Sequence, residues 1–210
     1  MPFHYHQWKK PLYHVGYMKA KPWPTSSMEG PLLSCSPCPE EWRQIAKLGP
    51  APVWKVVPHE PFQLVDMLGT PDRERKQLLE EACKLGVIKQ ATLYRVRCDS
   101  EDEDEEDRFM IFERKDEAVQ ETVEGEKPEP FEGWVSLPKL SLYWHGTQKH
   151  ISPSFVEDAT LVYLAEQTTP SLGVWWNETF DPASLSAPRT GIFPSRIRAV
   201  TKGRLEIKIK

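Results

Sequence analysis

The sequence has few cysteines, no long hydrophobic run and no recognisable leader, and each absence narrows what the protein can be. Four cysteines in 210 residues, unpatterned apart from one Cys-x-x-Cys pair, argue against the disulfide framework of a small secreted protein. No stretch approaches the ~18 consecutive apolar residues of a membrane span. The first ten residues lack the apolar core of a secretory signal. We therefore expect no membrane span and a reducing cytoplasmic location, with the nucleus as a second compatible compartment.

Catalytic and cofactor motifs are also missing. The sequence contains no His-Glu-x-x-His, no Gly-x-Ser-x-Gly, and no glycine-rich loop of the phosphate-binding or dinucleotide-binding kind. Cys35 and Cys38 could form a zinc site with the histidines at positions 4 and 6. A lone Cys-x-x-Cys pair is common by chance, however, and Pro37 restricts this one. We expect no catalytic residue, no cofactor and no metal, and therefore a protein that is not an enzyme.

Acidic residues are abundant in one segment only. Residues 99–132 hold 16 acids against 4 bases, whereas the rest of the chain holds 15 acids against 23 bases. The run Asp99–Asp107 is acidic at eight of nine positions. Such a run is hydrated and repels itself, which favours a solvated loop. Alternatively it contacts a basic surface, either on a partner protein or on the basic remainder of this chain. Nucleic acid is not expected as a partner.

Prolines and glycines divide the N-terminal half into short elements. Residues 1–39 are rich in aromatics and proline without a sustained period, and we interpret them as an extended arm anchored by its aromatics. Residues 40–86 predict three short helices. These are Glu40–Leu48, Pro61–Leu68 and a third that follows Thr70 and ends at Gly86.

From residue 87 onward the sequence favours strands. Ala91–Arg97 and Arg108–Glu113 alternate between apolar and polar residues, which predicts a hairpin with the acidic run at its tip. We assign residues 87–137 to this hairpin region, and its pattern also admits a degenerate copy of a small barrel. Further short strands are expected at the end of the hairpin region and in residues 138–210. They lie near Trp134 and at Leu140–Trp144, Thr160–Leu164, Gly173–Trp176, Gly191–Phe193, Arg196–Val200 and Arg204–Lys210.

Residues 140–200 carry a series of motifs in a characteristic order. Leu142-Tyr143 is followed by the segment Thr160–Leu164, then by Trp175-Trp176, and finally by Gly191-Ile-Phe-Pro-Ser195. In this order and spacing the segment resembles an SH3 domain. The resemblance implies an α+β fold in which short helices and the N-terminal arm precede a small antiparallel β-barrel at residues 138–210. It places Phe193 and Val162 in the barrel core.

The resemblance also implies a groove that binds extended, proline-rich peptides. Its residues would be Tyr143, Trp175 and Pro194, together with Ile197, which stands where the family has a tyrosine. Adjacent tryptophans on a strand point to opposite faces, so only one of the pair can be fully in the core. Either Trp175 forms this groove, or the tryptophans cover a contact with the helical half of the chain.

The sequence therefore predicts a non-catalytic adaptor or scaffold protein that binds other proteins through an SH3-like domain. The alternative is a structural subunit of a larger assembly, in which the barrel packs permanently against its neighbours. An internal ligand is also available: Pro58 and Pro61 form a Pro-x-x-Pro segment that could occupy the groove, because a tethered ligand has an effective concentration of order mM.

Overall fold

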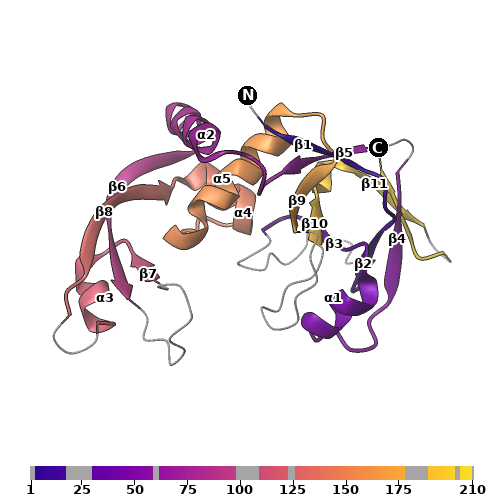
Figure 1. The fold of residues 1–210 in the computed structure, drawn as a ribbon, viewed down its shortest axis with the longest axis horizontal. Coiled ribbons are helices and arrows are strands. Elements are labelled where there is room, and N and C mark those ends of the chain that lie inside the picture. The colour runs from indigo at the N-terminus through magenta and orange to yellow at the C-terminus, as the bar shows by residue number, and fades with distance from the viewer. Residues whose placement is uncertain are drawn as a thin grey trace. The chain divides into compact units, whose positions relative to one another are not determined.

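The computed structural model describes residues 3–17, 30–58, 62–97, 109–122, 126–177, 189–201 and 204–209. The chain forms two compact units, whose elements are labelled in Figure 1. Unit 1 combines residues 1–78 with residues 162–210, and unit 2 is residues 79–161. The protein thus has a mixed α and β fold in which both ends of the chain belong to the same unit. Within the described ranges, no helix is long and apolar enough to cross a membrane.

Unit 1 contains two β-sheets. The five-stranded sheet has the order β1 (Tyr5–Trp8), β5 (Phe62–Asp66), β9 (Gly173–Asn177), β10 (Arg189–Ile192) and β3 (Leu33–Cys35). The four-stranded sheet has the order β11 (Ile197–Thr201), β12 (Glu206–Ile209), β4 (Val53–Val57) and β2 (Leu12–Val15). Strands β5 and β9 are parallel, as are β12 and β4, and the other neighbours are antiparallel. Over the part of the chain that is described, neither sheet closes into a barrel.

The two sheets of unit 1 share one hydrophobic core. They are joined where Tyr13 and Ser36 exchange backbone hydrogen bonds of 2.9 and 2.8 Å, which links β2 to β3. Both sheets contribute side chains to the core, which consists of Trp8, Leu12, Leu33, Cys35, Val56, Leu64, Leu172, Ile192, Ile207 and Ile209. Because consecutive residues of β5, Leu64 and Val65, are both buried, that strand is covered on its two faces.

Two helices and a helical turn complete the secondary structure of unit 1. Helix α1 (Pro39–Ile45) starts with a proline at its first position and has two acids in its first turn, an arrangement that suits a helix N-terminus. Helix α2 (Asp72–Lys84) ends before Gly86, whose φ of +66° favours glycine. The 3₁₀ turn η1 (Pro194–Arg196) connects β10 to β11. Helix α2 and a later helix, α5 (Pro153–Thr168), each contribute residues to both units.

Unit 2 is built on a three-stranded antiparallel sheet. Its order is β7 (Phe109–Phe112), β6 (Ile88–Arg97) and β8 (Glu129–Ser136). Its helices are α3 (Lys115–Gln120), α4 (Pro138–His145) and the N-terminal part of α5 (Pro153–Thr168). The buried hydroxyl of Ser136 accepts hydrogen bonds of 3.2 Å from the Ser141 hydroxyl and from the Ile151 amide. These bonds tie the end of β8 to α4 and to the start of α5.

Several expected elements are confirmed. Helix α1 overlaps the expected Glu40–Leu48, starting one residue earlier and ending at Ile45, and the third expected helix corresponds to α2. The Thr70 hydroxyl before α2 donates to the Asp66 carbonyl. Strands β6 and β7 form the expected hairpin, with Tyr94 opposite Phe112. The acidic run between them lies outside the described residues. Phe193 is completely buried, as is Val162.

Two N-terminal expectations are wrong. The segment expected as the helix Pro61–Leu68 is the strand β5, because pairing with β1 and β9 buries its apolar residues more fully than one helix face would. The N-terminal arm is not laid over a finished body either. Its described residues supply β1, β2 and β3 and so take part in both sheets of unit 1. Among its aromatics, Trp8 is a core residue, whereas Tyr5 and Tyr17 are exposed.

The strands expected at the start of the SH3-like segment are also wrong. Leu140–Trp144 lies in helix α4, and Thr160–Leu164 lies in helix α5. The barrel expected over residues 138–210 therefore does not describe residues 138–168. The second half of the motif series keeps its expected local structure: Gly173–Trp176 is in β9, Gly191 is in β10, and the Phe-Pro-Ser segment leads through η1 into β11.

Candidate binding site

A cavity of about 520 Å³ lies in unit 1, along the segment that joins β1 to β2, the end of β4 and the start of β5. Strand β1 ends there at Trp8, which lies opposite Phe62 at the start of β5. Across the cavity, Leu12 at the start of β2 lies opposite Val56 in β4. One residue pair from each sheet thus forms an aromatic and aliphatic lining. Small-ligand and peptide pockets have volumes of this order, roughly 300–1,000 Å³.

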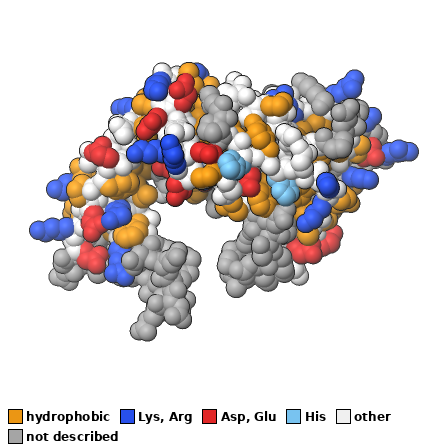
Figure 2. Space-filling model, turned by 45° about the horizontal axis from the view of Figure 1, so that its top comes forward, with side chains coloured by type: hydrophobic (Ala, Val, Ile, Leu, Met, Phe, Trp, Pro, Cys, Tyr) orange, Lys and Arg blue, Asp and Glu red, His pale blue; other side chains and the backbone are white. Residues whose placement is uncertain are grey.

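The turn between β1 and β2 and the end of β4 form the rest of the cavity. The turn supplies Lys9, Lys10 and Pro11, and the β4 segment supplies Lys55, Val57 and Pro58. The three lysine side chains are exposed, and Figure 2 shows blue basic side chains projecting from the visible face of unit 1, at the right of the view. Among the described residues that line the cavity, none carries a carboxylate; Glu60, between Pro58 and Phe62 in the sequence, lies outside the described residues. The site is therefore apolar inside and positively charged at its rim.

The side chain of Trp8 is buried together with a hydrogen-bond donor that has no described acceptor. The side chain is only 3% exposed, and its indole N–H finds no acceptor among the described residues. A buried donor without a partner costs about 1–3 kcal/mol. The indole of Trp175 is in the same situation.

The two adjacent tryptophans of β9 lie in different surroundings. Trp175 packs against the core of unit 1, and His6 of β1 stacks on it with ring centroids 5.2 Å apart. Trp176 instead lies beside Arg189, whose guanidinium is 5.0 Å from the ring centroid of Trp176 and 5.7 Å from that of Trp42. The expectation that the two side chains have different environments is thus met, with both half-buried.

Gly191 explains why the Gly-Ile-Phe-Pro-Ser motif starts with glycine. A Cβ atom at this position would lie 2.9 Å from the ring of Trp176 and 2.7 Å from the side chain of Leu32. Real Cβ atoms essentially never approach other atoms so closely, because packed interiors leave no spare volume. Glycine at position 191 therefore lets the Trp176 ring lie against β10.

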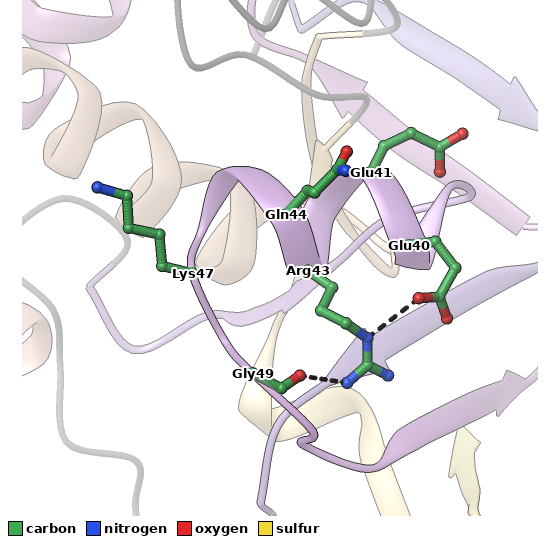
Figure 3. A pocket seen from close by; sticks show the side chains of 6 residues that line it. All are labelled: Glu40, Glu41, Arg43, Gln44, Lys47 and Gly49. Atoms are coloured by element: carbon green, nitrogen blue, oxygen red, sulfur yellow. Dashed lines mark hydrogen bonds and ion pairs between the residues drawn. The ribbon is translucent and has the colours of Figure 1, made fainter.

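A second cavity, of about 660 Å³, lies along helix α1 and is drawn in Figure 3. Its central cation is already engaged: Arg43 donates to Glu40 at 3.1 Å and to the carbonyls of Gly49 and Ala51 at 2.6 and 2.7 Å. Figure 3 shows Lys47 directed away from this network. Because its charges neutralise one another, this cavity offers a ligand less than the one beside Trp8.

The residues predicted for the peptide groove do not gather in one unit. Tyr143 lies on α4 in unit 2, whereas the other three lie in unit 1. Trp175 and Ile197 both pack against the unit 1 core, and Pro194 is the half-buried first residue of η1. The stacked His6 also covers part of Trp175. The interpretation of Trp175 as the open floor of a groove is therefore not supported by its packing.

The proposed internal ligand is described only in part. Pro58 lines the cavity beside Trp8, and Pro61 lies outside the described residues. The two histidines among the candidate zinc ligands make separate contacts: His4 pairs with Glu74 at 3.0 Å, and His6 stacks on Trp175. Among the described residues, no group of three or more potential ligands from histidine, cysteine, aspartate and glutamate is placed to hold a metal ion.

No disulfide joins the two cysteines of the Cys-x-x-Cys pair. Cys35 is buried, and Cys38, half-buried, precedes helix α1. Burial raises the pKa of the Cys38 thiol above its ordinary value, and the nearby Glu41 carboxylate raises it further, against a smaller opposite effect of Lys10. A thiol with a raised pKa is a weak nucleophile at neutral pH.

Sequence reasoning missed the three lysines of the cavity. The available signal was the Lys-Lys-Pro turn directly after a tryptophan, which places charge beside an aromatic anchor. Lys55 gives no such signal, because only the pairing of β2 with β4 brings it near the turn. In comparisons with known proteins, no family model, no curated sequence and no solved structure matches this chain.

Proposed function

We propose that this protein is a non-catalytic protein-binding protein, and that the cavity lined by Trp8 and Phe62 receives a segment of its partner. The observation that carries the proposal is the apolar lining of that cavity, formed by one residue pair from each sheet. Binding sites for proteins concentrate their energy in a few aromatic and aliphatic pockets surrounded by a polar rim. This cavity has that composition.

The size of the cavity suits one anchoring side chain and the chain on either side of it. Removing apolar surface from water contributes about 25 cal/mol per Å², so a single buried leucine or phenylalanine contributes about 1.5–3 kcal/mol. A flanking backbone in extended form passes over Pro11 and Pro58, which line the same cavity. Affinity in this arrangement comes from the anchor, and selectivity comes from the rim.

A second candidate function is a structural subunit that packs permanently in a larger assembly. It is favoured by the position of His6 on Trp175 and by the burial of Trp8, because a subunit that packs permanently uses these aromatics within its own core. The two functions differ in how readily the bound partner exchanges with free protein. A reversible binder releases its partner within minutes on dilution, whereas a permanent subunit does not exchange with added labelled protein.

The test is fluorescence anisotropy with defined peptides and the full chain. Three labelled ten-residue peptides share a central Leu-Phe pair and carry acidic, neutral or basic flanks. The variant Val57→Phe reduces the cavity volume without changing charge, and Val53→Phe makes the same change at the other end of β4. The proposal predicts that at least one peptide binds and that only Val57→Phe weakens it. If no peptide binds, or both variants act alike, the proposal is wrong.

A further inference from the structure

We infer that the segment received by the cavity beside Trp8 is acidic: an extended stretch with an apolar side chain flanked by aspartate or glutamate. This inference rests on the proposed function and assigns the chemistry of the partner. Ten of the described residues line the cavity; three of these ten are lysines and none is an acid. A positively charged rim around an apolar interior favours a negatively charged ligand. A positively charged ligand is repelled there, and a neutral ligand gains no electrostatic attraction.

The lysines bracket the apolar interior. Lys9 and Lys10 lie in the turn that follows Trp8, whereas Lys55 comes from β4 and lies opposite Tyr13 of β2. An extended ligand advances by about 3.3 Å per residue, and its alternate side chains point in opposite directions. One apolar side chain can therefore pack on the half-buried Val57, Pro58 and Phe62 while carboxylates on its neighbours reach the lysines.

The charges of these lysines are not neutralised within the described parts of the chain. No described carboxylate forms an ion pair with Lys9, Lys10 or Lys55. Glu206 of β12 lies opposite Lys55 in the strand register, but no ion pair joins the two side chains. Lys10 also lies close enough to Cys38 to act on its thiol. The positive field is thus available to a ligand.

The charge distribution of the whole chain agrees with this. Outside residues 99–132 the chain holds 23 bases against 15 acids, a net charge of +8. Unit 1 itself holds 17 of these bases and 11 of these acids, so its own charge is positive and attracts acidic segments. The run Asp99–Asp107 of this same chain, or of a second copy, is an alternative occupant that the experiment must separate from a partner.

The experiment measures the affinity of the acidic, neutral and basic peptides for the full chain and its variants. Replacing Lys9, Lys10 and Lys55 by glutamate reverses the rim, and Lys76→Glu makes the same kind of change on the exposed face of α2. We expect the acidic peptide to bind best, to lose about tenfold or more in affinity in the triple variant, and to bind the Lys76→Glu control within about twofold of the original chain. Raising the salt from 50 to 300 mM should weaken it further.

Each other result has a defined meaning. If the neutral or basic peptide binds as well as the acidic one, the cavity binds protein but the acidic chemistry is wrong. If no peptide binds, the proposed function itself fails. Far-UV circular dichroism and urea unfolding confirm that each variant is folded, and the single variant Lys9→Glu, at an exposed turn, gives a milder version of the same comparison.

The chain's own acidic run is examined with a variant in which the acids of 99–107 become asparagine and glutamine. A large gain in affinity for the acidic peptide would show that this run competes for the cavity and would overturn a partner as its occupant. A concentration-dependent dimer seen in sedimentation and abolished in the same variant would also overturn a partner as the occupant. It would show instead that the acidic run of a second copy occupies the cavity. Unchanged affinity and a monomer leave the cavity to a partner, as proposed.

Discussion

The ring of His6 stacks on the ring of Trp175, with centroids 5.2 Å apart and planes inclined by 18°. His6 also meets Trp8 edge-on at 5.5 Å. This contact joins β1 to β9 across β5, which lies between them in the sheet. The stack adds a contact between the N-terminal strand and the C-terminal part of the chain to the β1–β5 pairing, which places Trp8 opposite Phe62.

Removing this stack should destabilise unit 1. We expect His6→Ala to lower the free energy of unfolding by about 0.5–1.5 kcal/mol, the usual contribution of an aromatic pair. The exposed neighbour Gln7 on the same strand provides the control, and Gln7→Ala should change stability by no more than about 0.5 kcal/mol. Urea unfolding followed by tryptophan fluorescence measures both. Equal effects of the two substitutions would mean that the stack contributes nothing.

Substituting Phe193 tests whether the Gly-Ile-Phe-Pro-Ser motif contributes a core residue. Its side chain is completely buried, so Phe193→Ala leaves a cavity and should cost about 3–5 kcal/mol. Leu205 is 49% exposed, and Leu205→Ala should cost less than about 0.5 kcal/mol. Chemical denaturation of the two variants gives the comparison. A loss below 1 kcal/mol for Phe193→Ala would contradict its place in the core.

His14 should make stability depend on pH. Its Nδ1 lies 2.8 Å from the Ser34 carbonyl, and burial lowers the pKa of His14 below its ordinary value of 6.5 despite that bond. Between the two pKa values the unfolded chain binds more protons than the folded one, so stability is full above pH 6.5 and falls as the pH is lowered through this window. The variant His14→Gln should show a smaller decline between pH 7.5 and 5. An identical decline would exclude His14 as its source.

Cys38 should react slowly with alkylating reagents. Burial and Glu41 both raise the pKa of its thiol, so little thiolate is present at pH 7.5. We expect Glu41→Gln to accelerate modification of Cys38 by iodoacetamide, as followed by mass spectrometry. Glu40, which pairs with Arg43 instead, supplies the control Glu40→Gln with an unchanged rate. Fast modification of Cys38 in the unaltered chain would contradict this environment.

Elements with clear local signals were predicted from the sequence. Gly86 marks the C-terminal end of α2, and the residues of β6 and β7 alternate between apolar and polar. Each of these local patterns is typical of one kind of element, a helix end in the first case and a strand in the second. Helix α4 carried equally good signals, since Pro138 occupies its first turn and Gly146 ends it with a φ of +67°. The match of Leu142-Tyr143 to a family motif outweighed these signals and led to a strand.

Helix α5 could not be recognised from periodicity. Its residues Val156, Ala159, Thr160, Leu161 and Val162 are all buried, so no single apolar stripe with polar residues opposite it can be seen. The β-branched residues around Thr160 also favour strands. In the helix the Thr160 hydroxyl donates to the Val156 carbonyl at 2.6 Å, which removes the cost of burying this group.

The cavity could not be predicted because it depends on long-range pairing. Trp8 meets Phe62, and Leu12 meets Val56, only through strands that are far apart in sequence. No local pattern places Lys55 near the Lys9–Pro11 turn. The aromatic residues of the arm were recognised as anchors, but their role as strand residues needs the partner strands to be known.

The most direct test of protein binding at this cavity is NMR titration of the full chain with the acidic peptide. Indole N–H signals in ¹H–¹⁵N spectra report each tryptophan separately. Trp8 lines the cavity and its N–H has no acceptor among the described residues, whereas Trp144 is buried in α4 of unit 2. We predict that the Trp8 signal shifts in proportion to bound peptide and that the Trp144 signal stays in place. Shifts that spare Trp8 while the peptide binds, or no shift at all, would contradict the account.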